Sequence, residues 1–178
     1  MTTILVATDG SDHADKALDV ACDLANERKA ELKILHARMD DKEPADMMKL
    51  LVLQARGGGL MQTLKDAADR SGDEPSPEAI MQDQSRPLHH VSTQVLEEIG
   101  QMVLADAEEH CRSRGLNSEV LPIAVAKPAA AILAAADELD AAIVVMGCRG
   151  VGDFEAFSFG SVSHEVCEKA NCTCITVK

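Results

Sequence analysis

The sequence contains no tryptophan and no tyrosine, and only three of its 178 residues are phenylalanine. So little aromatic surface argues against proteins that bind single-stranded nucleic acids by stacking bases on aromatic side chains. Basic residues are also few, because 17 Lys and Arg stand against 30 Asp and Glu, for a formal net charge of −13. Since affinity for nucleic acids and anionic membranes grows with the number of cationic contacts, neither is expected as a partner. A small anion could still bind where backbone amides or a few cations outweigh the overall negative charge.

Long apolar segments are missing too. The longest unbroken apolar run is residues 129–136, far short of the roughly 20 residues that cross a bilayer. The N-terminus leads directly into a strand-like segment, residues 4–7, without the basic and apolar regions of a secretion signal. The expected location is therefore the cytoplasm.

Six cysteines are present, but no two have the C-x-x-C spacing of redox or metal motifs. Cys172 and Cys174 are two positions apart in a predicted strand, so both side chains lie on one face, in poor geometry for a mutual disulfide. His164 and Cys167 do not complete a structural zinc pattern with them. The cysteines are expected to be reduced thiols that pack as small apolar side chains.

Short apolar segments alternate with amphipathic ones along most of the chain. Five apolar segments predict β-strands, at residues 4–7, 32–35, 119–125, 141–146 and 172–177. Helix periodicity and start signals predict four helices, at residues 12–29, 91–114, 128–139 and 161–170. Pro122 removes a backbone donor from the third strand, which therefore belongs at a sheet edge. The pattern favours an α/β fold: an open five-stranded parallel sheet, doubly wound, with helices on both faces, as in nucleotide-binding Rossmann-like proteins.

Residues 1–178 are expected to form one domain. Within it, residues 38–90 depart from the alternation and are predicted to be a helical insertion after the second strand, with a polar tip at residues 71–77. The Met and Leu side chains of the insertion either pack on the domain or form a lid or partner-binding surface. Packing is the simpler interpretation.

A glycine-punctuated segment follows the fourth predicted strand. Gly147 and Gly150 allow backbone amides to turn toward a bound group, and nine residues later Gly160 and Ser161 begin a helix. Free N–H groups at a helix N-terminus favour anions, so the pattern indicates a phosphate site. The alternative is a tight turn followed by a routine helix cap. A second polar segment, residues 8–11, follows the first strand, and both segments are expected at the carboxyl edge of the sheet, where such folds bind ligands.

Residues 146–163 resemble the G-x2-G-x9-G-(S/T) loop of nucleotide-binding members of the universal stress protein family, with both spacings met. Residues 4–11 are similar to the opening strand of that family and its aspartate. Residues 32–37 are similar to the second strand, and residues 171–177 to the closing strand. The resemblance covers both ends of the chain and skips much of residues 38–90.

The resemblance implies a site for ATP with its Mg²⁺. Asp9, next to Thr8, would lie beside the ribose or the metal, and the backbone of Ala37 would meet the adenine. The ribose and phosphates would be lined by Met146, Gly147, Arg149, Gly150, Gly160, Ser161, Val162 and Ser163. Arg149 would neutralise phosphate charge or remain a solvated side chain, and Asp9 would bind the ligand or only form a turn.

Three functions are compatible with these residues. A phosphate site without an evident base or nucleophile favours a stress-response protein that binds ATP as a sensor or regulator, with little or no catalysis. The first alternative is a nucleotide-independent homodimer, paired through residues 172–177, that works as an interaction or chaperone-like module. The second is a slow ATPase or phosphotransferase with Asp9 as metal ligand. Asp153 and Glu155 in the loop would weaken ATP binding unless Mg²⁺ intervenes or their side chains point outward.

Overall fold

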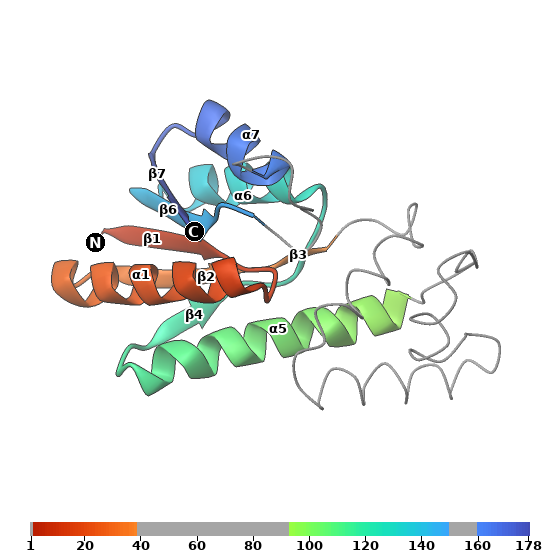
Figure 1. Cartoon of the computed structure of the whole chain (residues 1–178), viewed down its shortest axis with the longest axis horizontal. Coiled ribbons are helices and arrows are strands. Elements are labelled where there is room, and N and C mark those ends of the chain that lie inside the picture. The colour runs from red at the N-terminus through yellow and green to blue at the C-terminus, as the bar shows by residue number, and fades with distance from the viewer. Residues whose placement is uncertain (1, 39–92, 150–159) are drawn as a thin grey trace.

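A computed structural model describes residues 2–38, 93–149 and 160–178 of the chain (Figure 1). Its centre is a five-stranded sheet in the order β4-β2-β1-β6-β7, in which every neighbouring pair is parallel. The strands are β1 (Thr3–Ala7), β2 (Glu31–Leu35), β4 (Ser118–Val120), β6 (Ile143–Gly147) and β7 (Thr173–Val177). The predicted five-stranded parallel sheet is confirmed, and β4 lies at an edge as Pro122 indicated.

Helices cover both faces of this sheet (Figure 1). One face packs against α1 (Asp12–Arg28) and α5 (Thr93–Ser113), and the other against α6 (Pro128–Glu138) and α7 (Ser161–Lys169). The four predicted helices are therefore present, each within a few residues of its expected bounds. At 21 residues α5 is the longest of them, about 32 Å at the rise of an α-helix, and it extends past the end of the sheet in Figure 1.

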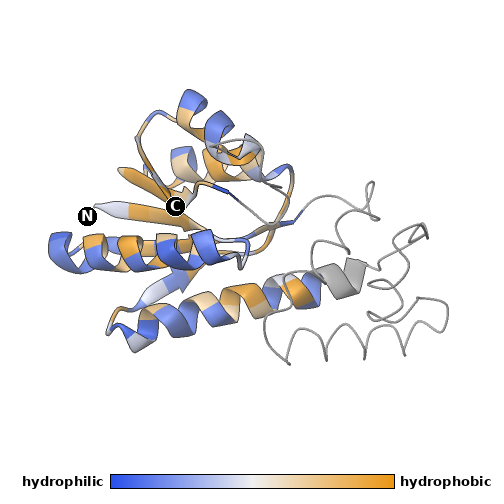
Figure 2. Ribbon diagram, in the orientation of Figure 1, coloured by the Kyte–Doolittle hydropathy of each residue, from blue (hydrophilic) through white to orange (hydrophobic). Residues whose placement is uncertain are grey.

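The strands carry apolar side chains on both faces, because both are covered. In β1, Ile4 and Val6 pack with α1 and α5, whereas Leu5 packs with α6 and α7. Figure 2 shows the same division, with hydrophobic strands at the centre and hydrophilic residues along the outer side of α1. This two-sided burial explains why the strands have nearly continuous apolar sequences.

Local signals fix the start of two helices. Ser11 caps α1, since its hydroxyl accepts a hydrogen bond from the N–H of Ala14 at 3.2 Å. Asp12 and Asp15 lie in the first turn of α1, where the helix dipole stabilises negative charge. Pro128 occupies the first turn of α6, where its missing N–H costs no hydrogen bond.

The prediction of one strand over residues 119–125 is wrong. The segment divides into β4 and a separate strand, β5 (Ala124–Val125), because Pro122 between them cannot donate to a ladder. β5 pairs in parallel with β3 (Ala37–Arg38) in a second, two-stranded sheet. Arg38 therefore belongs to a strand and not to the insertion predicted for residues 38–90, the rest of which lies outside the described residues.

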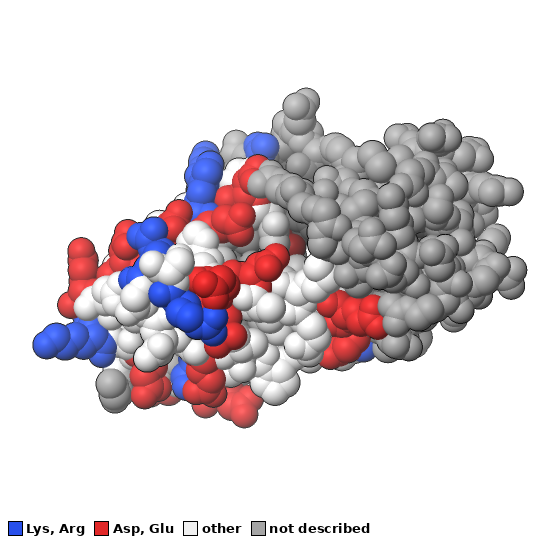
Figure 3. Space-filling model, turned by 90° about the horizontal axis from the view of Figure 1, so that it is seen from below, with Lys and Arg blue, Asp and Glu red and all other residues white. Residues whose placement is uncertain are grey.

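No helix in the described part of the chain is both long enough and apolar enough to span a membrane. On the face seen in Figure 3, acidic side chains cover more of the described surface than basic ones do. This agrees with the excess of Asp and Glu in the sequence.

Candidate functional site

The winding of the sheet reverses next to β1. From β1 the chain proceeds to β2 and β4 on one side, and it then crosses to β6 and β7 on the other. The carboxyl ends of β1 and β6 therefore flank the switch point, which is where open α/β sheets bind ligands. Thr8 and Asp9 follow β1 at this point, and Cys148 and Arg149 follow β6.

A tight turn joins β1 to α1 on one side of the switch point. The N–H of Gly10 donates to the hydroxyl of Thr8 at 3.2 Å, and the N–H of Ser11 donates to Oδ1 of Asp9 at 3.1 Å. Gly10 has a φ of +76°, a conformation that favours glycine. The Asp9 carboxylate therefore stabilises the turn, which is one of the two roles that the sequence left open for it. Its other role, as a ligand of the ribose or the metal, stays a prediction.

Gly147 allows the end of β6 to approach the start of α1 on the other side of the switch point. A Cβ at this position would lie 2.9 Å from Cβ of His13 and 3.0 Å from the carbonyl oxygen of Arg149. Atoms other than hydrogen rarely come this close without a hydrogen bond, so only glycine fits. His13 thus lies at the site, although nothing in the sequence pattern indicated it.

The two ends of the glycine-punctuated loop are held together. The N–H of Gly160 donates to the carbonyl of Cys148 at 2.7 Å, and the N–H of Cys148 donates to the carbonyl of Val177 at 2.7 Å. The buried hydroxyl of Ser163 lies 2.9 Å from the carbonyl of Cys148 and 3.1 Å from that of Gly160. These bonds bring the start of α7 to the carboxyl end of β6. Gly150 and residues 151–159, with the three phenylalanines and Asp153 and Glu155, lie outside the described residues.

The N-terminus of α7 presents backbone donors at this place. Gly160 is the N-cap, and the amides of Ser161, Val162 and Ser163 are the first three of the helix, which have no intrahelical acceptor. The helix dipole adds positive potential there. Ser161 has an exposed side chain, whereas the hydroxyl of Ser163 is turned toward the loop backbone. A role for Ser163 in binding phosphate therefore depends on its amide, and it stays a prediction.

His36 directly follows β2 and contacts the turn after β1. Its Nδ1 lies 2.9 Å from the carbonyl oxygen of Thr8, and because a carbonyl only accepts, Nδ1 carries the proton. Burial lowers the pKa of His36, since the imidazolium would lose hydration, and the bond to Thr8 and the charges of Asp9 and Glu97 oppose this effect. His36 is thus a packed histidine in neutral form.

Acidification below about pH 6.5, the ordinary pKa of histidine, is expected to destabilise the protein through His36. Its pKa is lower in the folded than in the unfolded state, so the unfolded chain takes up the proton first and the free energy of unfolding falls with pH. His36→Asn keeps an N–H donor for Thr8 but does not titrate, so it should reduce this loss. Thermal unfolding of both proteins between about pH 7.5 and pH 5.5 measures the difference. Equal losses in the two proteins would assign the effect to other groups.

α5 packs closely against His36, at the end of β2, and against the turn after β1. A Cβ on Gly100 would lie 2.7 Å from Cδ1 of Ile123 and 3.1 Å from Cδ2 of His36. A Cβ on Gly10 would lie 3.3 Å from Cγ2 of Val103. Gly100 was not among the predicted site residues, although a glycine inside a helical segment is a known sign of close packing.

The backbone of Ala37 faces away from β5. The N–H of Ala124 donates to the carbonyl of His36 at 3.0 Å, and the N–H of Ala126 donates to the carbonyl of Arg38 at 3.1 Å. Because backbone groups alternate in direction along a strand, those of Ala37 point to the opposite side. That side has no strand partner among the described residues.

The predicted site residues divide into three groups. Thr8 and Asp9 follow β1 at the switch point, and Gly147 and Arg149 lie opposite them at the end of β6. Residues 160–163 lie at the same edge of the sheet, where the hydrogen bond from Gly160 to Cys148 holds them. Ala37 lies beyond β2 at the same edge. Met146 instead has a buried side chain that packs with α6 and α7, so only its backbone is available to a ligand. No cluster of three or more potential metal ligands occurs among the residues described, and Asp9 as a Mg²⁺ ligand stays a prediction.

Comparison with known proteins gives one consistent family. A sequence profile of the Universal stress protein family matches residues 1–178. The universal stress protein YxiE of Bacillus subtilis (strain 168) is 29% identical over 175 residues, which cover 98% of this chain and 97% of that protein. The similarity therefore extends over nearly the whole length of both proteins.

Two solved structures of similar fold are universal stress proteins. The universal stress protein from Archaeoglobus fulgidus in complex with dAMP has a TM-score of 0.61 and 22% identity, over 100% of this chain and 98% of that one. A universal stress protein in complex with cAMP has a TM-score of 0.61 and 22% identity, over 99% and 97% of the two chains. At this identity the likeness shows a shared fold.

Proposed function

Because the chain belongs to the universal stress protein family, whose profile matches residues 1–178, we propose that it binds ATP with Mg²⁺ at the switch point and acts as a sensor or regulator. The observation that carries the proposal is the convergence of three backbone elements at one edge of the sheet. These are the turn after β1, the end of β6 and the N-terminus of α7. Such an arrangement suits a polyanion, because backbone donors and a helix dipole favour negative charge without needing many cations.

In this proposal the phosphates lie against the amides of residues 161–163, with Gly147, Arg149 and Gly150 around them and the ribose. Arg149 would supply one positive charge next to the phosphates, in a protein whose net charge of −13 otherwise repels them. The amides of α7 are essential to this binding mode, because they supply donors and a positive helix end in a protein with an excess of Asp and Glu.

The adenine would lie on the β3 side of the site, where the backbone of Ala37 faces away from β5. Thr8 and Asp9, between Ala37 and the α7 amides, are suited to the ribose hydroxyls or a metal-bound water. Two universal stress proteins of similar fold support an adenine nucleotide, since they are in complex with dAMP and cAMP. Both ligands combine an adenine with a phosphate.

Little or no catalysis is proposed, because three polar side chains at the site, those of Asp9, His36 and Ser163, already make hydrogen bonds within the fold. The Asp9 carboxylate accepts from the turn, His36 donates to the Thr8 carbonyl and is neutral, and the Ser163 hydroxyl bonds the loop backbone. Phosphoryl transfer needs positioned ligands for Mg²⁺ and a side chain that is available to orient the nucleophile. A slow ATPase remains the enzymatic alternative, and release of phosphate that Asp9→Asn abolishes would favour it.

Ser161→Pro is expected to weaken ATP binding about tenfold or more, because it removes one amide donor from the phosphates and hydrogen bonds to charged groups contribute about 1.5–3 kcal/mol. Proline is well tolerated here, since Ser161 is the first residue of α7 and Gly160 before it is extended, at φ −72° and ψ 155°. Ser161→Ala keeps the amide and is the matched control. Equilibrium titration with a fluorescent ATP analogue and Mg²⁺ measures affinity, and thermal unfolding confirms that both variants fold.

Two results would contradict the proposal. If a folded Ser161→Pro variant bound ATP with wild-type affinity, the α7 amides would not contribute to phosphate binding. Absence of saturable binding by the wild-type protein below about millimolar ATP, the weak end of useful affinities, would remove nucleotide binding itself.

We also propose a homodimer through β7, on the observation that among the described strands it pairs with β6 alone and forms one edge of the sheet. Its unpaired side offers a row of backbone donors and acceptors to a second copy. Light scattering of the purified protein measures the mass in solution. A dimer that forms equally with and without ATP would favour the interaction-module alternative, and a monomer would exclude it.

A further inference from the structure

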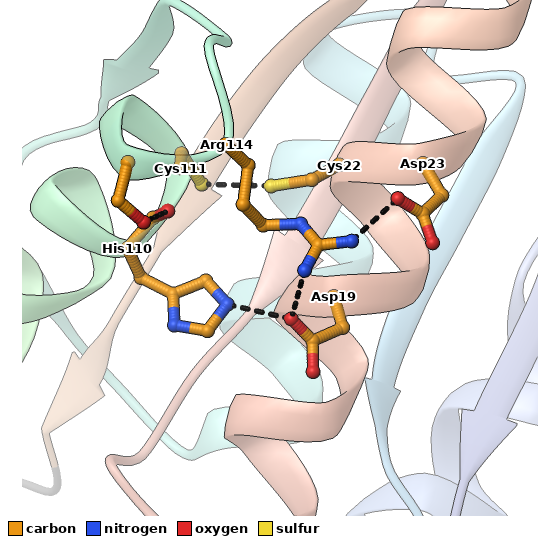
Figure 4. Close-up of polar contacts among 7 residues, drawn as sticks. Asp19, Cys22, Asp23, His110, Cys111 and Arg114 are labelled. Atoms are coloured by element: carbon orange, nitrogen blue, oxygen red, sulfur yellow. Dashed lines mark hydrogen bonds and ion pairs between the residues drawn. The ribbon is translucent and has the colours of Figure 1, made fainter.

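Two cysteines far apart in sequence are in contact between α1 and α5. Sγ of Cys22 lies 3.2 Å from Sγ of Cys111, 89 positions further along the chain. Both residues are 0% exposed, and neither belongs to the nucleotide site proposed above. Figure 4 shows their side chains directed toward each other from the two helices. Their spacing in the sequence gave no sign of this pair.

A polar bridge lies beside the two sulfur atoms (Figure 4). His110 Nε2 lies 2.8 Å from Oδ1 of Asp19, and the Arg114 guanidinium lies 2.9 Å from the same oxygen and 2.6 Å from Oδ1 of Asp23. These bonds join the last turn of α5 and the residue after it to the outer side of α1. Cys111 is therefore flanked by the cationic side chain of Arg114 and by a histidine.

This environment favours the thiolate of Cys111. The S–H of Cys22 donates to Cys111 and lowers the pKa of Cys111, with smaller contributions from Ser118, His110 and Arg114, while burial opposes them. A thiol of lowered pKa is the nucleophile in thiol oxidation. Cys22, as the donor, remains protonated beside it.

We propose that Cys22 and Cys111 form a dithiol pair that hydrogen peroxide converts into a disulfide joining α1 to α5. The two sulfur atoms need to approach from 3.2 Å to the roughly 2.0 Å of a disulfide, a change within the reach of side-chain rotation and a small helix shift. Peroxide fits this pair better than a bulky disulfide does, because both thiols are buried.

The chemistry balances in two steps. The Cys111 thiolate attacks one oxygen of the peroxide, the O–O bond breaks, and Cys111 becomes a sulfenic acid while the hydroxide that leaves takes up a proton to form water. The sulfur of Cys22 then attacks the sulfenic sulfur, the S–S bond forms and the S–O bond breaks. The departing hydroxide takes the Cys22 proton as a second water. The two sulfurs lose two electrons, which reduce the peroxide.

The ion-pair bridge controls access to the pair. Arg114 and His110 hold α5 against α1 through Asp19, so peroxide reaches Cys111 when this contact opens. Asp19→Ala removes the carboxylate that both side chains bind and leaves Arg114 and His110 in place, so it is expected to increase the rate of disulfide formation severalfold without changing its product. Arg112→Ala is the matched control, because it breaks an ion pair with Glu108 that lies within α5 and does not join the two helices.

The test uses the full chain and a C167S/C172S/C174S variant, which lacks the cysteine of α7, that of β7 and the one just before β7. Each protein is treated with hydrogen peroxide, denatured and alkylated, and peptides are mapped by mass spectrometry. The expected product is a Cys22–Cys111 cross-linked peptide pair, with two hydrogens lost and both thiols recovered after dithiothreitol. Cys111→Ala and Cys22→Ala in the same background should give no cross-link.

The wild-type result alone can overturn the proposal, even if a cysteine variant fails to fold. Cys22 and Cys111 that are both still alkylated after the exposed Cys167 has been fully oxidised would identify them as inert packed thiols. A cross-link that forms only in urea would have the same meaning. Because ATP takes no part, failure here would leave the proposed nucleotide site unaffected.

Discussion

Replacement of Gly147 by alanine is expected to weaken ATP binding by more than tenfold and to lower the free energy of unfolding by about 1–3 kcal/mol, the usual cost of overpacking. The added methyl would lie 2.9 Å from Cβ of His13, 3.0 Å from the backbone carbon of His13 and 3.0 Å from the carbonyl oxygen of Arg149. Two of these neighbours are backbone atoms, so the strain moves the start of α1 or the loop after β6. Those are the two sides of the proposed site. Nucleotide titration and urea unfolding measure the two effects.

Gly115→Ala is the matched control for this prediction. Gly115 has a φ of +75°, but a Cβ there would meet no atom within 4 Å. This variant is therefore expected to lose about 1 kcal/mol from backbone strain alone and to bind ATP as the wild type does. Unchanged affinity in Gly147→Ala would mean that the nucleotide does not depend on the geometry at the end of β6.

Leu5→Ala is expected to lower the free energy of unfolding by about 3 kcal/mol, within the range of 2–5 kcal/mol for buried leucines. Leu5 is 0% exposed, in the central strand, and its side chain packs with α6 and α7. A cavity there has rigid walls, because strands flank β1 on both sides. The midpoint of urea unfolding, with an unchanged m-value, measures the loss.

Val125→Ala provides the comparison on the surface. Val125 is 51% exposed in β5, so this change is expected to alter stability by less than about 0.5 kcal/mol. A loss of under about 1 kcal/mol in Leu5→Ala would show that the layer between the sheet and α6 can collapse to fill the space.

The fold was predictable because its signals are local. Apolar segments of strand length, the Ser11 cap and Pro128 at a helix start each depend on residues close together in sequence. The same holds for the glycine-punctuated loop, whose spacing indicated the family that the profile confirms. Pro122 correctly indicated an edge strand. It also separates β4 from β5, and this division was not predicted because it depends on how far the chain bends after the proline.

The unpredicted features are contacts between distant segments. The Cys22–Cys111 pair, the approach of Gly100 to His36 and the pairing of β3 with β5 each join residues that no spacing rule relates. The first two arise from the crossing of α5 over the sheet, and the position of a long helix depends on the sum of its packing contacts. Ser163 illustrates the same limit, because its motif position did not reveal that its hydroxyl bonds the backbone of Cys148.

The pairing of β1 with β6 constrains how this protein emerges during translation. Ile4 pairs with Ile143, which is synthesised 139 positions later. At ordinary rates of synthesis, β1 therefore lacks this neighbouring strand for about 7 to 28 s. During that interval a nascent chain can pair β1 with β2, and β2 with β4, but the other edge of β1 stays open. An apolar strand edge that is unpaired makes a partly synthesised chain prone to aggregate, so the late synthesis of β6 sets how long this protein carries that risk.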